Sequence, residues 1–334
     1  MENTTPTTSP APFEQAISRI AAIRDEVRKV FFGQDIVLDQ VLAAFFAGGH
    51  VLIEGKPGLG KTHLVLAMAR TFGGVFRRIQ FTPDLMPSDV TGHTLYDMSA
   101  QQFRLRKGPA FTNLLLADEI NRAPAKTQSA LLEVMQEWQV TIDGESHPLP
   151  PPFMTLATQN PIEQEGTYPL PEAQLDRFLM KVVIDYPGTP DEERIVNELL
   201  NGGGLRVSEL PQVCTVAEVL EIQRAVAAVQ AVPEVVAYAV QLVRATREAQ
   251  GIALGAGTRG AISLVRVGKA FAAMNQRDFV TPDDIKSAAL PVLRHRVAIA
   301  PELAISGQSV DDTLSAIIAT TEAPRRILGK PQVA

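Results

Sequence analysis

The chain has 334 residues, of which 46% are hydrophobic and 20% charged, with a formal net charge of -6 at pH 7. This composition is that of a globular protein and excludes wholesale disorder, and the length favours two domains. The acidic balance disfavours nucleic acid and anionic lipid as partners, and the single cysteine, Cys214, excludes an internal disulfide and a cysteine-based zinc site.

The first residues differ in composition from the rest of the chain. Residues 1–12 are rich in Thr and Pro and carry neither a basic segment nor an apolar one, so we expect a disordered tail and no secretion signal. No later run approaches the 18 apolar residues of a membrane-spanning helix. The sequence therefore predicts a cytoplasmic protein without a membrane span.

Alternating strand and helix patterns predict the fold of the N-terminal part. Residues 12–30 have apolar side chains at three- and four-residue steps, which indicates an amphipathic helix. Five apolar runs then have the length of strands in a buried parallel sheet, and with intervening helices they predict a three-layer α/β core over residues 13–187. The predicted strands cover residues 51–53, 75–81, 114–117, 153–157 and 178–184.

The pattern becomes helical after residue 187. Residues 188–210 are predicted to be a linker that includes a glycine-rich joint at 201–204, and residues 211–330 a second, helical domain. Thr281 is expected to cap one of its helices, with Pro282 in the first turn. The predicted helices cover residues 213–229, 234–250, 259–274 and 281–292.

Residues 55–62 fit the pattern G-x-x-x-x-G-K-[ST] and lie between a predicted strand and a predicted helix. In that context glycines let backbone N–H groups surround phosphate oxygens at a helix N-terminus. Lys61 would reach the β- and γ-phosphates of ATP, and Thr62 would hold Mg²⁺. A glycine-rich turn without a ligand is the plainer alternative. The predicted nucleotide-binding residues are Gly55, Lys56, Pro57, Gly58, Leu59, Gly60, Lys61, Thr62 and His63.

Two carboxylates follow the apolar run 114–117. Asp118 and Glu119 would lie beside the phosphates at the carboxyl edge of the sheet. Asp118 is predicted to bind Mg²⁺ and Glu119 to polarise the water that attacks the γ-phosphate. Two acids on the surface after a strand are the alternative.

The order of these motifs resembles that of the AAA+ ATPases. Asn160, in the run 155–161, resembles the family's sensor 1, which orients water and the γ-phosphate, although an Asn before a Pro is otherwise a plain turn. Arg177, in the run 175–178, resembles the arginine finger that enters a neighbouring subunit's site, although a lone arginine is otherwise a surface cation.

Longer strings resemble the MoxR family, in the helix-2-insert branch of the AAA+ ATPases. The resemblance covers roughly residues 13–330 and implies an AAA+ αβα core with a five-stranded parallel sheet, followed by a smaller all-α lid. It also implies a homo-oligomeric ring, usually a hexamer, that acts on protein substrates with a von Willebrand factor A domain protein as partner. The strings that carry it are Gly33-Gln34, residues 48–52, 81–89, 118–124, 128–133 and 157–161.

Further positions are assigned by the same resemblance. Residues 90–109 resemble the helix-2 insert and 139–149 the pre-sensor-1 hairpin, for which an Asp-Gly turn is independent support. Both hairpins could contact a client or brace neighbouring subunits. Phe31-Phe32-Gly33-Gln34 would line the adenine pocket by the same resemblance, with Gly33 and Gln34 as its predicted binding residues, although an apolar pair at a helix end is more often part of the core.

Three further arginines, Arg259, Arg266 and Arg122, have alternative assignments. Arg259 resembles sensor 2, although Gly257-Thr258 replaces the family's usual Ser-Pro and Arg266 follows on the same helix face; action in cis or in trans stays open. Arg122 fits either a contact between subunits or a helix-cap salt bridge.

The motifs predict an ATP hydrolase that binds ATP and Mg²⁺, and the resemblance to the MoxR family implies that it remodels or activates protein clients. A nucleic-acid-directed motor, a chelatase-type subunit that drives metal insertion, and a nucleotide switch that does not hydrolyse ATP are the alternatives. Because Glu119, Asn160 and Arg177 are all present, the sequence disfavours the switch.

Overall fold

A computed structural model describes residues 12–160, 166–200 and 205–324. The predicted disordered tail, apart from Pro12, lies outside the described residues, as do the predicted glycine-rich joint at 201–204 and the end of the chain after Pro324. The division into core, linker and lid therefore stays a prediction at its boundaries.

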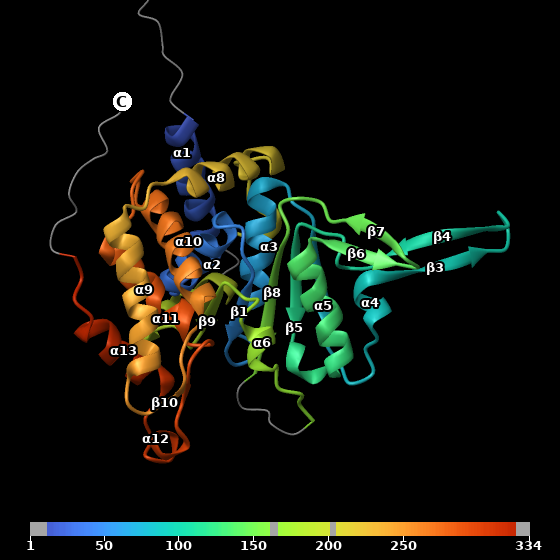
Figure 1. The fold of residues 1–334 in the computed structure, drawn as a ribbon. Coiled ribbons are helices and arrows are strands. Elements are labelled where there is room, and N and C mark those ends of the chain that lie inside the picture. The colour runs from blue at the N-terminus through green and yellow to red at the C-terminus, as the bar shows by residue number, and fades with distance from the viewer. Residues whose placement is uncertain (1–11, 161–165, 201–204, 325–334) are drawn as a thin grey trace, which may run out of the picture.

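Five strands form one parallel sheet in the order β2-β5-β8-β1-β9 (Figure 1). Every neighbouring pair in the sheet is parallel, so all five carboxyl ends lie at one edge. The predicted five-stranded parallel sheet is confirmed, and each strand falls within two residues of its predicted range. The strands are β1 Val51–Glu54, β2 Phe76–Gln80, β5 Leu114–Asp118, β8 Met154–Gln159 and β9 Met180–Val183.

Alternate side chains of the strands enter two different cores. Val51 and Ile53 of β1 pack with the helices on one face of the sheet, whereas Leu52 packs with α5 on the other. Because side chains alternate along a strand, short apolar runs bury both faces and give the three layers. The helices of this region are α1 Pro12–Arg28, α2 Asp35–Phe46, α3 Lys61–Phe72, α4 Pro87–Thr91, α5 Ala125–Glu137 and α6 Glu172–Leu175.

Both predicted hairpins are present. In the second, Asp143 and Gly144 have φ of 51° and 84°, the left-handed conformations that a tight Asp-Gly hairpin turn requires. The first projects away from the body of the molecule (Figure 1), and its side chains Tyr96, Met98 and Phe103 are exposed. The hairpins consist of β3 Gly92–Asp97 with β4 Gln102–Lys107, and of β6 Gln139–Ile142 with β7 Glu145–Pro148.

The C-terminal region is helical, as predicted. Thr281 caps α11: its hydroxyl accepts a hydrogen bond from the Asp284 N–H at 3.4 Å, and the Asp284 carboxylate accepts one from the Thr281 N–H at 2.8 Å. Pro282 is the first residue of that helix. The elements are α8 Val216–Ala228, α9 Pro233–Glu248, α10 Thr258–Met274, α11 Pro282–Leu293, α12 Pro301–Ile305 and α13 Val310–Thr320.

Two details of the lid differ from the sequence-based expectation. The lid is not entirely helical, because β10 Ile252–Leu254 and β11 Ala298–Ile299 form a short antiparallel ribbon. Strands of two or three residues are too short to leave a periodic signal. Within the predicted linker lie helix α7 Thr189–Leu200 and the 3₁₀ turn η2 Val207–Glu209.

The lid packs against the core through shared apolar side chains. One buried cluster contains residues of α1, α2 and α3 together with residues of α8 to α11. Helix α1 contacts α8, and α2 contacts α10. In the part of the chain that the structure describes, no helix has both the length and the apolar character needed to cross a membrane.

His50 lies buried between α5 and the sheet. Its Nδ1 accepts a hydrogen bond from the Thr155 N–H at 3.0 Å, so its Nε2 must carry the proton and donate to the Met135 carbonyl, at 2.9 Å. The rings of Trp138 and Phe153 lie 5.5 and 5.6 Å away. Burial lowers the pKa of His50 from 6.5 to about 4, so the ring is neutral at neutral pH.

We expect His50 to make the protein less stable in mild acid. The unfolded chain binds a proton at His50 below pH 6.5 and the folded chain only near pH 4, so stability present above pH 6.5 is lost as the pH falls. At pH 5 this amounts to about 2 kcal/mol of unfolding free energy. Urea unfolding between pH 7 and 5 measures it. The variant His50→Gln, which has no titrating ring, should show a weaker pH dependence, and an unchanged dependence would contradict the assignment.

Candidate functional site

A cavity of about 420 Å³ opens at the carboxyl edge of the sheet. It brings together residues at or just after the carboxyl ends of β1, β5 and β8, and two side chains from β2, the strand next to β5. Motifs that are far apart in the sequence therefore meet at one site. The lining residues include Gly55, Pro57, Gly58, Leu59, Gly60, Lys61, Thr62, His63, Arg78, Gln80, Asp118, Glu119, Thr158 and Asn160.

The glycine-rich loop has the backbone that its sequence predicts. Gly60 precedes α3 with φ of 78°, a left-handed conformation that favours glycine. At Gly55 a Cβ atom would lie 2.5 Å from the Ile184 carbonyl oxygen, so only glycine fits this close approach to the chain after β9. The loop thus delivers Lys61 and Thr62 at the first turn of α3.

Lys61 points back toward the loop. Its Nζ donates to the Gly55 carbonyl oxygen at 2.6 Å. Burial lowers the pKa of Lys61, and the nearby carboxylates of Asp118 and Glu119 act in the opposite direction. Lys56, by contrast, does not line the cavity: its Nζ lies over the Tyr186 ring, 4.7 Å from the ring centre.

Both oxygens of the Asp118 carboxylate accept hydrogen bonds. The Thr158 hydroxyl donates to Oδ1 at 2.5 Å, and Arg78 Nη2 pairs with Oδ2 at 2.6 Å. The Arg78 guanidinium therefore compensates the charge at the carboxylate that the sequence assigns to the metal.

Glu119 has three polar contacts, one through its backbone N–H and two through its carboxylate. Its backbone N–H donates to the Thr158 hydroxyl at 2.9 Å, and its Oε2 accepts from Gln80 Nε2 and pairs with Arg122 Nε, each at 2.9 Å. Its φ of 56° is rare for a residue with a side chain and turns the chain sharply at the end of β5. Arg122 thus forms the salt bridge at the start of η1 Ile120–Arg122 that was one of its two predicted roles.

Arg78, Gln80 and Thr158 are site residues that motif reasoning missed. Gln80 lies opposite Asp118 in the parallel register of β2 and β5, and Arg78 lies two residues earlier on the same strand. Thr158 is the last residue but one of β8, the strand that leads to Asn160. These residues could be found only from the order of the strands in the sheet. The spacing of the apolar runs in the sequence does not show which strands are neighbours.

Of the remaining predicted nucleotide-binding residues, two line this cavity and two do not. Asn160 is buried at the cavity wall, and His63 lies exposed at its rim, with its pKa lowered by partial burial. Gly33 and Gln34 do not line this cavity. Gly33, with φ of 71°, packs against Asp191 of α7, and the Gln34 carbonyl begins α2 by accepting from the Leu38 N–H at 3.0 Å.

Arg177 and Arg259 line a second cavity. Both line a cavity of about 360 Å³ between α5, the segment before β9 and the lid helix α10, and neither lines the cavity that contains Lys61. Arg266 and Arg296 also line it, and among the described residues Asp176 is its one acidic lining residue. The structure therefore separates the two predicted arginines from the predicted phosphate loop of their own chain, the glycine-rich loop of residues 55–62.

The donor atoms at the first cavity suit magnesium. The Asp118 carboxylate and the Thr62 hydroxyl supply hard oxygen ligands, and Mg²⁺ usually takes only one or two protein oxygens beside water and phosphate. Arg78 at Asp118 Oδ2 indicates that this carboxylate is stabilised by a cation. Asp118 and Thr62 are the residues that would hold the ion.

The chain matches the model of the ATPase family associated with various cellular activities (AAA) over residues 50–180, and that of the AAA lid domain over residues 244–317. It is 42% identical over 300 residues to the uncharacterized protein YeaC of Bacillus subtilis, covering 90% of this chain and 93% of YeaC. It is 40% identical over 309 residues to Chaperone MoxR1 of Mycobacterium tuberculosis, covering 90% and 81%. The crystal structure of a Cytophaga hutchinsonii protein matches with a TM-score of 0.87 at 42% identity, covering 94% and 97%.

Proposed function

The chain belongs to the MoxR family of AAA+ ATPases, and on that premise we propose that it hydrolyses ATP in a homo-oligomeric ring, a hexamer, to remodel or activate protein clients. The observation that carries the proposal is the meeting of Lys61, Asp118, Glu119 and Asn160 at one cavity. Phosphate-binding, metal-binding and water-activating groups are all needed for hydrolysis, whereas nucleotide binding alone needs only the first two.

The residues of the first cavity would have different roles in hydrolysis. The backbone of Gly55 to Thr62 would bind the phosphates, with Lys61 neutralising charge on the β- and γ-groups. Glu119 would take a proton from water as the water oxygen attacks the γ-phosphorus and the bond to ADP breaks, and Asn160 would orient that water. Mg²⁺, held by Asp118 and Thr62, would neutralise charge on the phosphate oxygens.

Arg177 and Arg259 would act on a neighbouring subunit. Both line a cavity that excludes the phosphate loop of their own chain, which supports action in trans for each. In a ring with head-to-tail contacts, the same surface on every subunit can face the next subunit's nucleotide. An arginine supplied in this way stabilises charge that develops on the γ-phosphate.

Protein clients are favoured over other substrates by two observations. The relative MoxR1 is named a chaperone, and the projecting β3–β4 hairpin exposes Tyr96, Met98 and Phe103. Exposed apolar side chains at the end of a hairpin can bind unfolded or partly folded protein. We extend the proposal to a von Willebrand factor A domain protein as partner, by resemblance to the family.

ATP turnover per subunit, measured over a wide range of protein concentration, tests the proposal. We expect the turnover to rise with concentration, because complete sites form only between subunits, and to rise further with reduced casein as an unfolded client. No turnover at any concentration would refute hydrolysis. Stimulation by double-stranded DNA that weakens with salt would instead favour a nucleic-acid motor.

A further inference from the structure

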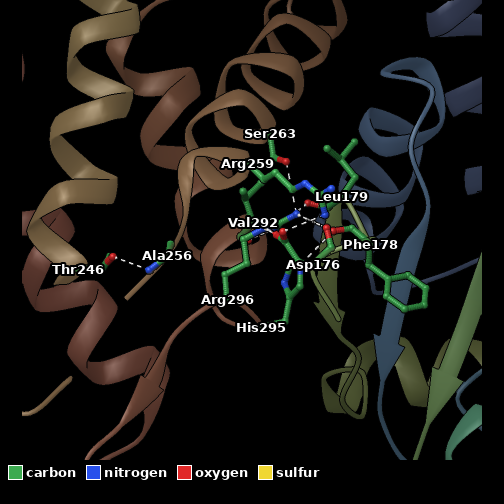
Figure 2. A network of polar contacts seen from close by, with 10 residues as sticks. All are labelled: Asp176, Phe178, Leu179, Thr246, Ala256, Arg259, Ser263, Val292, His295 and Arg296. Carbon is green, nitrogen blue, oxygen red and sulfur yellow. Dashed lines mark hydrogen bonds and ion pairs between the residues drawn. The ribbon is translucent and has the colours of Figure 1, made fainter. Parts of the chain in front are cut away.

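An ion pair whose arginine is buried joins the lid to the core beside Arg259, one of the two arginines assigned to the neighbouring site (Figure 2). Arg296 follows helix α11 of the lid, and its side chain is only 3% exposed. Its Nε pairs with Asp176 Oδ1 at 2.8 Å, and Asp176 directly precedes Arg177 in the chain. The two partners lie 120 residues apart in the sequence.

Arg296 also fixes the backbone after Arg177. Its Nη2 donates to the Phe178 carbonyl at 2.7 Å, and its Nη1 donates to the Leu179 carbonyl at 3.2 Å and to the Val292 carbonyl of α11. The Arg296 side chain thus binds three core residues next to Arg177, and it connects them to the end of α11. The three residues are Asp176, Phe178 and Leu179.

Asp176 connects this anchor to the lid's other arginine. Its second oxygen, Oδ2, pairs with Arg259 Nη1 at 3.4 Å, at the first turn of α10. Arg259 is 64% exposed, whereas Arg296 is buried. An exposed ion pair at this distance is weak and can open when an anion arrives, but a buried arginine cannot lose its counter-charge without a large penalty.

On the proposed function, we infer that Asp176 and Arg296 are positioning residues that make Arg177 and Arg259 one unit, aimed together at the nucleotide of the neighbouring subunit. Asp176–Arg296 holds the finger segment to the lid, and Asp176 Oδ2 keeps Arg259 beside it until a phosphate attracts that guanidinium. The cavity favours an anionic ligand, because the described residues that line it include four arginines and one carboxylate. Arg177 of the core and Arg259 of the lid would therefore bind the same phosphate group together.

The test is Asp176→Asn, which keeps the shape of the side chain but removes its charge. We expect ATP turnover to fall at least about tenfold, since the interaction is charge-assisted. Binding of a fluorescent ATP analogue should change less than twofold, because Asp176 does not line the first cavity, which contains Lys61. The matched control is Asp311→Asn, which breaks the pair of another mostly buried lid arginine, Arg294, at 2.9 Å but away from this cavity. It should keep its turnover.

Mixing with Glu119→Gln separates positioning from a general loss of structure. If Asp176 acts on the neighbouring site, equal mixing before assembly should restore turnover, with about one site in four combining an intact Glu119 with an intact arginine surface. No restoration, or normal turnover of Asp176→Asn alone, would overturn the inference. The proposed trans sites fail separately if Arg177→Ala is not restored in the same mixture.

A double variant keeps the inference testable if Asp176→Asn does not fold. Asp176→Asn with Arg296→Met leaves no buried charge unpaired, and such replacements are often neutral for stability. It should fold, bind the analogue normally, lose turnover to the same degree and be restored by mixing. Normal turnover of this folded variant would refute a positioning role.

Discussion

Replacement of Glu119 by Gln should lower ATP turnover at least about a hundredfold while ATP remains bound. Gln has the same shape and can keep contacts with Gln80 and Arg122, but it cannot take a proton from water. The phosphate loop is unchanged, so the nucleotide should bind with its normal affinity. Turnover in a phosphate-release assay and titration with a fluorescent ATP analogue measure the two properties.

The geometry of Glu119 makes this variant informative. Its backbone is fixed by the Thr158 hydroxyl and its carboxylate by two partners, so Glu119→Gln should change chemistry and not position. Glu302→Gln, an exposed acid on α12, is the matched control and should hydrolyse ATP normally. If Glu119→Gln keeps more than half of the turnover, another group is the base.

Local signals predict the strands and the second hairpin, and they point to residues that line the first cavity. The eight residues of the glycine-rich loop, 55–62, are consecutive, and Asp118 and Glu119 follow directly on an apolar run. The Asp143-Gly144 turn likewise specifies its hairpin through two neighbouring φ angles. Such signals can be detected without knowing which distant segments meet.

The missed residues depend on contacts between distant segments. Gln80 and Arg78 reach the carboxylates only because β2 lies beside β5 in the sheet, with Gln80 opposite Asp118. Arg296 lies outside the motifs named in the sequence analysis, and its proposed role arises from its contacts with Asp176, Phe178 and Leu179. Side-chain partners of this kind follow from the tertiary fold and leave no periodic pattern in the sequence.

Replacement of Arg177 by Ala should reduce ATP turnover by about a thousandfold, the usual effect of removing an arginine that stabilises phosphoryl transfer. Arg177 does not line the first cavity of its own chain, so the variant subunit should still bind ATP normally. The matched control is Arg244→Ala, a surface arginine of α9 paired with Glu248 at 3.5 Å. Only Arg177→Ala should be inactive.

The decisive measurement mixes two inactive variants. Arg177→Ala retains Glu119, and Glu119→Gln retains Arg177, so a ring that contains both variants forms some sites with all catalytic groups. If subunits are combined before assembly, turnover should return to about one quarter of the wild-type value. If arginine and glutamate instead served the same chain's nucleotide, no combination of the two variants could complete a site, and the mixture would stay inactive. Because the separate variants are both inactive, any recovered turnover must come from sites shared between subunits.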